Sequence, residues 1–190
     1  MPGTLMDRVG SAPISWGVCE VPGWGAQLPV ERVLTEMVSL GLTATELGSV
    51  GYLPTEPEAL TTLLERHGMQ LTGGFNALVL HDDARTDEML DQARAGADLL
   101  AAGGADTFVT CAVSDPGDWQ RVALTEIEWQ TMFDNIARVD EICRDRGLVQ
   151  AFHPHVDSLV ETAPEIARVA DSTSVGFVLE TGHMLIGGLD

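Results

Sequence analysis

The chain has 190 residues, 45% of them hydrophobic, and it carries 29 acidic against 10 basic residues. This length is enough to bury a core and matches the size of one domain. A net charge of −19 excludes the basic stripe with which nucleic-acid-binding proteins neutralise phosphates. No apolar run approaches the roughly 20 residues of a membrane span. Neither a nucleic acid nor a membrane is therefore expected as a partner.

The cysteines and the start of the chain indicate the compartment. Cys19, Cys111 and Cys143 lie far apart without CxxC spacing, which favours reduced thiols over disulfides or a thiolate metal site. The first ten residues lack the basic start and apolar run of a secretory signal. We therefore expect a cytoplasmic protein. The sequence contains no lysine, which excludes Schiff-base chemistry.

Short apolar or β-branched runs alternate with longer helical patterns along the whole chain. The runs predict six strands, and the patterns between them carry apolar residues at helical spacing. The predicted strands cover residues 9–15, 44–47, 70–75, 107–111, 149–152 and 175–179. The predicted helices cover residues 29–40, 56–67, 86–102, 125–146 and 162–170. Repeated βα units at this spacing predict a parallel sheet with right-handed crossovers.

Prolines and glycines mark the helix boundaries. Prolines lie near three helix starts and glycines follow four helix ends, as expected of left-handed caps; they are Pro29, Pro57 and Pro164, and Gly41, Gly68, Gly103 and Gly147. A parallel sheet is either open and doubly wound or rolled into a barrel. The segment WGVCE after the first predicted strand matches neither glycine-rich phosphate loop, which favours the barrel.

Polar residues at the carboxyl ends of parallel strands form the active site in such folds. His153 and His155 follow the fifth predicted strand, and Pro154 between them favours an extended backbone. Glu180 and His183, three residues apart, lie on the loop predicted after the sixth strand. An isolated histidine is more commonly a hydrogen-bonded structural residue. Two such groups at successive strand ends predict half of a metal site.

Two further positions are candidates for substrate contacts. Glu46 ends the second predicted strand among small and apolar residues, which suits a carboxylate that orients hydroxyl groups; a capping or solvent-facing role is the alternative. Trp16 and Trp24 suit an apolar wall over a sugar or cyclitol ring, although tryptophans commonly pack in a core.

Four segments together resemble a known family: APISWGVCEVPGWG, TELGSVGYLP, AFHPHVDSLVET and VLETGH. They are similar to the inosose dehydratase branch of the xylose isomerase-like TIM-barrel superfamily, and the resemblance covers nearly the whole chain. It implies one α/β domain over residues 1–190, a TIM (β/α)8 barrel that stops after its sixth strand. The remaining two strands would lie beyond Asp190.

The resemblance also implies a divalent metal held by side chains from strands five to eight. His153 and Glu180 stand at the first two ligand positions, Glu180 where aspartate is usual, and the other two ligands would lie beyond Asp190. Replacing a carboxylate with an imidazole favours Mn²⁺ or Co²⁺ over Mg²⁺.

The implied reaction is dehydration of a keto-cyclitol such as inosose through an enediolate. His155 and His183 are the expected proton carriers, since imidazole titrates near neutral pH. Glu46, Trp16 and His183 are the expected substrate contacts.

Three alternatives remain open. The first is a sugar or sugar-phosphate isomerase or epimerase of the same superfamily. The second is an endonuclease IV-like repair enzyme, against which the acidic charge argues. The third is a truncated, non-catalytic barrel fragment. In an incomplete barrel two sheet edges would face water, so we also expect a homo-oligomer.

Overall fold

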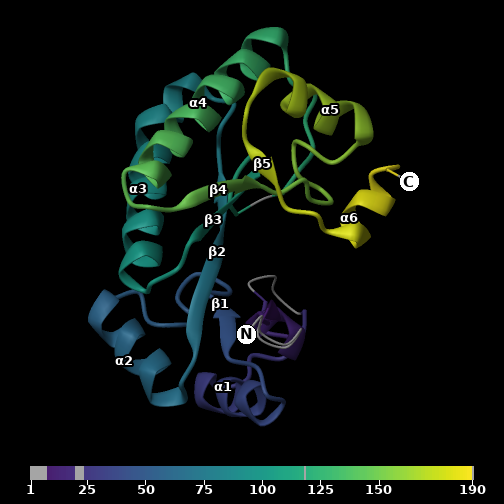
Figure 1. Ribbon diagram of the computed structural model, residues 1–190. Helices are drawn as coiled ribbons and strands as arrows, with labels where there is room; N and C mark the ends of the chain where they lie inside the picture. Colours follow the sequence, from purple (N-terminus) through teal and green to yellow (C-terminus); the bar gives the residue numbers. More distant parts are fainter. Residues whose placement is uncertain (1–7, 20–23, 118, 190) are drawn as a thin grey trace. The chain divides into compact units, whose positions relative to one another are not determined.

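The computed structural model describes residues 8–19, 24–117 and 119–189 (Figure 1). The chain forms two compact units, which are described separately. The first unit comprises Met1–Phe75 and Asp98–Thr107, and the second comprises Asn76–Ala97 and Phe108–Asp190. That the chain is a single domain remains a prediction.

Five strands form one sheet in the order of the sequence, β1-β2-β3-β4-β5. The pairs β1/β2 and β4/β5 are parallel. The strands are β1 (Ala44–Glu46), β2 (Gln70–Leu78), β3 (Thr107–Ala112), β4 (Val149–Phe152) and β5 (Gly176–Phe177). The helices between and after them are α1 (Val30–Ser39), α2 (Pro57–His67), α3 (Thr86–Ala102), α4 (Glu126–Arg144), α5 (Ala163–Ser172) and α6 (Thr181–Ile186), with 3-10 turns η2 (Pro13–Trp16) and η3 (Asp83–Arg85). The βα alternation expected from the sequence is confirmed.

The strand predicted at residues 9–15 was wrong, because only one residue of it pairs with the sheet. Ser11 donates its backbone N–H to Ala44 O and accepts from Glu46 N, which makes an isolated parallel bridge to β1. Pro13 then follows with no N–H to continue a ladder, and it opens η2. The described part of the chain therefore has five strands and a bridge where six strands were expected.

Three of the four predicted glycine caps adopt the left-handed conformation, and the fourth is displaced by one residue. Gly41, Gly68 and Gly147 have positive φ, but after α3 it is Gly104, at φ 77°, rather than Gly103. Gly103 is favoured for a different reason. A Cβ there would lie 2.7 Å from a methyl carbon of Leu71, so a larger residue would require the Leu71 side chain to shift.

In the second unit α3 and α4 lie side by side against the strands (Figure 1). Phe108 of β3 faces α3, since a Cβ at Gly96 would lie 3.3 Å from its ring. Asn135 of α4 donates to Leu80 O at 3.0 Å and to Thr86 Oγ1 at 3.2 Å, which ties α4 to the end of β2 and the start of α3. Strand residues alternate between faces, so the residues next to those that face the helices point the other way.

None of the described helices is both long and apolar enough to cross a bilayer.

Candidate active site

His153 follows the last residue of β4 and continues its alternation. Its backbone N–H donates to Thr110 O at 2.7 Å, which extends the pairing with β3 by one residue. Phe152 is fully buried and packs edge-on against Phe177 of β5. His153, one residue on, therefore points to the opposite face of the sheet, where it is 8% exposed.

The segment after His153 forms a tight loop. Ser158 N–H donates to His155 O at 3.1 Å, His155 N–H donates to Val160 O at 3.2 Å, and Leu159 N–H donates to Ala112 O at 2.9 Å. Asp157 adopts φ 62°. This left-handed conformation is unfavourable for a residue with a Cβ, so the surrounding contacts must impose it.

Glu180 and His183 belong to a short helix, not to the loop expected from the sequence. Glu180 is the N-cap residue of α6, and His183 lies three residues on. Residues three apart share one face of a helix, so both side chains point the same way. The helix fixes the spacing between Glu180 and His183, which a loop would leave variable.

Backbone contact holds α6 against the segment after β4. Ala163 N–H donates to Gly187 O at 3.0 Å. A Cβ added at Gly187 would lie 2.1 Å from Glu161 O, so no other residue fits there without a shift.

The structure brings four of the predicted site residues together. Glu180 Oε2 lies 3.1 Å from His153 Nε2, and Glu180 Oε1 lies 3.1 Å from His183 Nε2. The rings of His155 and His183 are 3.9 Å apart between centroids. One ligand atom from each of the three imidazoles lies within 4.8 Å of the others. Nitrogen donors beside a carboxylate are a set that suits Zn²⁺, Co²⁺ and related divalent ions, so the residues present fit a metal.

Burial favours the neutral form of two of these imidazoles. Burial, together with the neighbouring His155 and His183, lowers the pKa of His153 to about 4. Burial is also the main cause that lowers the pKa of His155, against a raising contribution from its hydrogen bond to Val156. A neutral imidazole offers the lone pair that a metal or a proton requires.

The backbone of Val156 sets opposite tautomers in His155 and His183. Val156 O is only an acceptor, so His155 Nδ1, 2.6 Å away, must carry a hydrogen. Val156 N–H is only a donor, so His183 Nδ1, 3.4 Å away, must accept. The neutral His155 ring therefore has its lone pair on Nε2. The neutral His183 ring has its hydrogen on Nε2, facing the Glu180 carboxylate.

Two residues of the segment between β3 and α4 belong to this site and were not identified from the sequence. Trp119 packs edge-on against His155, with ring centroids 4.9 Å apart. Arg121 donates to Ser158 O, Glu161 and Glu165 around the loop after His155. The available signal was a tryptophan and an arginine in the loop that follows the carboxyl end of β3.

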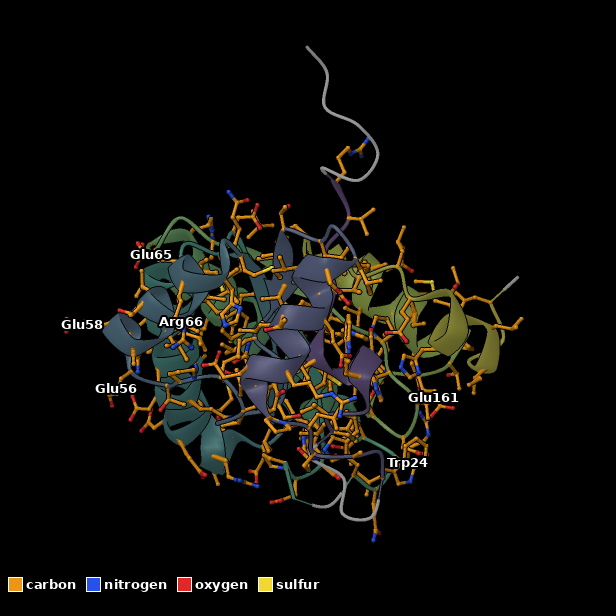
Figure 2. The ribbon with its side chains drawn as sticks, turned by 90° about the horizontal axis from the view of Figure 1, so that it is seen from below. Trp24, Glu56, Glu58, Glu65, Arg66 and Glu161 are labelled. Carbon is orange, nitrogen blue, oxygen red and sulfur yellow. The ribbon has the colours of Figure 1, made fainter. Side chains whose placement is uncertain are left out.

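The remaining predicted contacts, Trp16 and Glu46, lie in the first unit, and their substrate role stays a prediction. Trp16 donates its indole N–H to Glu36 Oε2 of α1 at 2.8 Å, so its polar group is already used. Glu46 is exposed at the carboxyl end of β1. Trp24 is 73% exposed, and Figure 2 shows it at the surface.

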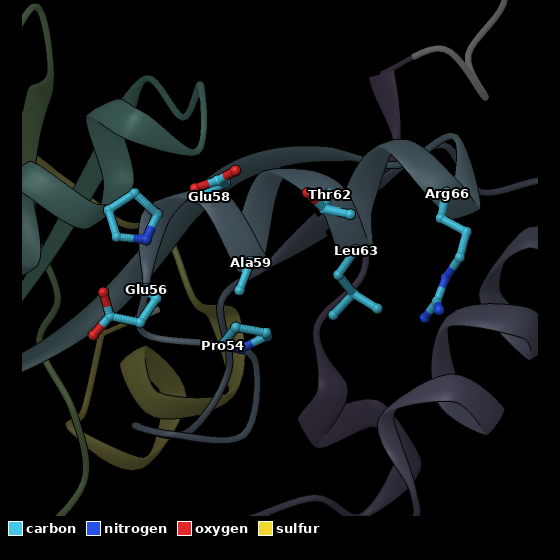
Figure 3. Close-up of a pocket in the computed structure, with 8 residues that line it drawn as sticks. Pro54, Glu56, Glu58, Ala59, Thr62, Leu63 and Arg66 are labelled. Carbon is cyan, nitrogen blue, oxygen red and sulfur yellow. The ribbon is translucent and has the colours of Figure 1, made fainter.

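A hollow lies elsewhere, on the first unit. It measures about 750 Å³ and runs along α2 between Glu56 and Arg66 (Figure 3). Glu56, Glu58 and Glu65 extend from this helix into solvent (Figure 2). This groove contains none of the histidines, and its charged groups are solvated, so the histidine cluster is the stronger candidate.

Comparison with known proteins identifies the family of the chain. The model of the xylose isomerase-like TIM barrel family matches residues 34–190. The chain therefore belongs to this family. It is 33% identical to an inosose dehydratase of Geobacillus kaustophilus over 96% of its own length and 63% of that protein. It is 30% identical to the rhizopine catabolism protein MocC of Rhizobium meliloti over 96% of its length and 58% of that protein.

Solved structures share the fold at low identity. The IolI protein with a bound zinc atom matches with a TM-score of 0.72 and 14% identity, over 95% of this chain and 65% of that one. The 3-keto-D-glucoside 4-epimerase YcjR of E. coli matches with a TM-score of 0.68 and 15% identity, over 94% and 70%. The predicted TIM-barrel class is confirmed, and the chain spans about two thirds of these relatives.

Proposed function

We propose that this protein is a metal-dependent dehydratase that acts on a keto-cyclitol such as inosose. The observation that carries the proposal is the cluster of three imidazoles around Glu180, in which two rings are held in opposite tautomers. The relatives named inosose dehydratase support the same reaction class.

His153 and Glu180 are the proposed metal ligands in this chain. His153 follows the last residue of β4, Glu180 is the N-cap residue of α6, and their ligand atoms are 3.1 Å apart. When bound, a divalent metal supplies Lewis acidity to the ketone of the substrate. Mn²⁺ and Co²⁺ are the proposed ions, and the zinc in the IolI structure makes Zn²⁺ a third candidate.

The opposite tautomers give the two residues different roles. His155 Nε2, with its lone pair, takes the proton from the carbon next to the ketone and becomes an imidazolium. The His155 imidazolium then donates this proton to the departing β-hydroxyl group, while His183 Nε2–H donates a hydrogen bond to the same oxygen. The carbon–oxygen bond breaks, water leaves, and a carbon–carbon double bond forms. After one turnover both rings are neutral again.

A small polyhydroxylated ketone suits this environment. Trp119, which packs on His155, offers an apolar face at the rim of the cluster. Cyclitols present carbon-bound hydrogens to aromatic faces and hydroxyls to polar side chains.

Location of the protein in the cytoplasm is also part of this proposal.

Isomerisation or epimerisation is the second candidate. The same pair of imidazoles would return the proton to carbon if the hydroxyl did not leave, and YcjR and an L-ribulose 3-epimerase share the fold.

Mass spectrometry of the product separates the two reactions. The protein would be loaded in turn with Mn²⁺, Co²⁺ and Zn²⁺ and incubated with inosose in deuterated water. A product that has lost one water supports dehydration. A product that has lost no water but carries one deuterium at the α-carbon supports epimerisation. His155→Gln should abolish either change, and His67→Gln, a histidine of α2 paired with Glu31, is the matched control. If the metal-loaded protein formed neither product, the proposed function would be overturned.

A further inference from the structure

The three imidazoles of the site lie close enough together to hold a single ion. One ligand atom from each of His153, His155 and His183 lies within 4.8 Å of the other two. Two nitrogens bound to one Zn²⁺ at about 2.1 Å lie roughly 3.4 Å apart in a tetrahedron, so side-chain movements of about 1 Å would complete the set. The cluster therefore offers a ligand set besides the pair of His153 and Glu180.

His155 already has the hydrogen bond that is typical of a metal-ligating histidine. Its Nδ1 lies 2.6 Å from Val156 O, so Nδ1 carries the hydrogen and Nε2 has the lone pair. Histidines that bind metals commonly donate the other ring N–H to a backbone carbonyl, which fixes the ring and makes the ligating nitrogen more basic. Because His155 is not a ligand in the proposed function, this bond is a separate observation in favour of a second set.

His183 can join this set by giving up one long hydrogen bond. Its Nδ1 accepts from Val156 N–H at 3.4 Å, which is near the upper limit for such a bond. Losing this contact frees the Nδ1 lone pair, while Nε2–H keeps its contact with Glu180 Oε1 at 3.1 Å. A carboxylate on the other ring nitrogen is a further arrangement that supports metal-ligating histidines.

The two ligand sets suit different ions. Mn²⁺ prefers carboxylate and water oxygens in octahedral geometry, whereas Zn²⁺ binds imidazole more tightly and is satisfied by three protein ligands and one water. A set of three nitrogens therefore favours Zn²⁺ over Mn²⁺ more strongly than one nitrogen beside a carboxylate does.

We propose that Zn²⁺ binds this protein through His153, His155 and His183, and that zinc held in this set inhibits the reaction. Coordination occupies the lone pair of His155 Nε2, the atom that takes the proton from the substrate. His153 belongs to both sets, so Zn²⁺ and Mn²⁺ exclude each other. The inhibition rests on the proposed function, whereas the ligand set does not.

Metal affinities of the whole chain, measured by isothermal titration without substrate, test the ligand set. His155→Gln should lower Zn²⁺ affinity by about 10- to 100-fold and change Mn²⁺ affinity by no more than about twofold. His67→Gln, which removes the ring paired with Glu31, is the matched control and should leave both affinities unchanged. Unchanged Zn²⁺ affinity in His155→Gln, or equal losses for both ions, would overturn the proposal.

X-ray absorption at the zinc edge needs no substitution, so the ligand set can be tested even if His155→Gln fails to fold. The unaltered, zinc-loaded chain should show three imidazoles around the ion. Fewer than three imidazoles would overturn the ligand set.

Addition of Zn²⁺ to the Mn²⁺-loaded protein during turnover of inosose tests the inhibition. Dehydration should fall in proportion to the zinc bound, and a zinc-loaded protein as active as the Mn²⁺-loaded one would overturn the inhibition. If no ion gave turnover, the proposed function and with it the inhibition would fail. The affinities and the absorption spectrum would still decide the ligand set.

Discussion

The ring centroids of His155 and His183 lie 3.9 Å apart, with the rings tilted by 40°. His155 is hydrogen-bonded to the carbonyl oxygen of Val156, and His183 to the N–H of the same residue. Their division of labour gives the first prediction. Replacing either with Gln should lower kcat by about 10² to 10⁴, because His155 serves as base and then acid and His183 donates a hydrogen bond to the departing hydroxyl group. His155→Gln should also stop exchange of the α-hydrogen with deuterated water, whereas His183→Gln should retain it, since only the base is needed for exchange. Equal loss of exchange in both variants would contradict the assignment.

Metal binding should depend on His153. His153→Gln removes a ligand atom that lies 3.1 Å from Glu180, so we expect Co²⁺ affinity to fall by about 100-fold or more. Isothermal titration of the purified protein measures this directly. His67→Gln should bind Co²⁺ as the unaltered chain does, and unchanged binding by His153→Gln would remove His153 from the ligand set.

The two carboxylate oxygens of Glu180 contact different imidazoles, those of His153 and His183. The length of the Glu180 side chain should therefore matter for metal binding. Glu180→Asp shortens the arm by one methylene and cannot keep both 3.1 Å contacts. We therefore expect weaker Co²⁺ binding, by roughly tenfold, even though aspartate is also a good ligand. Glu180→Gln keeps the length and loses the charge, so it separates reach from charge. Tighter Co²⁺ binding by Glu180→Asp would contradict the prediction that the length of Glu180 is required.

Stability of the metal-free protein should fall on acidification. The pKa of His153 is about 4 in the folded chain and about 6.5 when unfolded, so below pH 6.5 the unfolded state binds a proton that the folded state does not. The stability from neutral His153 is complete above pH 6.5 and is lost as the pH falls to 4. The expected loss reaches about 3 kcal/mol. Urea unfolding across this range measures it, and His153→Asn should flatten the profile.

The contact at Gly187 predicts a stability difference between two glycines of the same segment. Gly187→Ala places a Cβ 2.1 Å from Glu161 O and should destabilise the protein by about 1 to 3 kcal/mol. Gly182→Ala, in the first turn of α6, meets nothing within 4 Å and should be neutral or slightly stabilising. Thermal unfolding compares the two. Equal melting temperatures would mean that α6 is not packed on this loop.

Much of the fold was predictable because helix ends carry proline and glycine signals, and β4 has the predicted bounds. The prediction at residues 9–15 was wrong because the apolar pattern does not reveal where Pro13 ends the pairing. The six-residue α6 is too short to show a helical period. That His153, Glu180 and His183 lie close together followed from strands whose ends meet.

The rest of the site could not be predicted, for physical reasons. Trp119 and Arg121 lie in a segment without regular structure, so no periodicity relates them to His155. The tautomers depend on the orientation of one peptide, at Val156, which sequence spacing does not determine. The expected homo-oligomer also stays a prediction, which light scattering would check.

The contact of Gly187 with Glu161 also bears on how His155 and His183, the two proposed proton carriers, would move relative to each other. β5 has only two residues, so the sheet itself ties α6 weakly to β4. The contact at Gly187 instead joins α6, which contains His183, to the loop after β4, which contains His155. This contact is between backbone atoms, with no flexible side chain between them. If the sheet edge opened, both rings would move together, and the 3.9 Å distance between their centroids would be conserved.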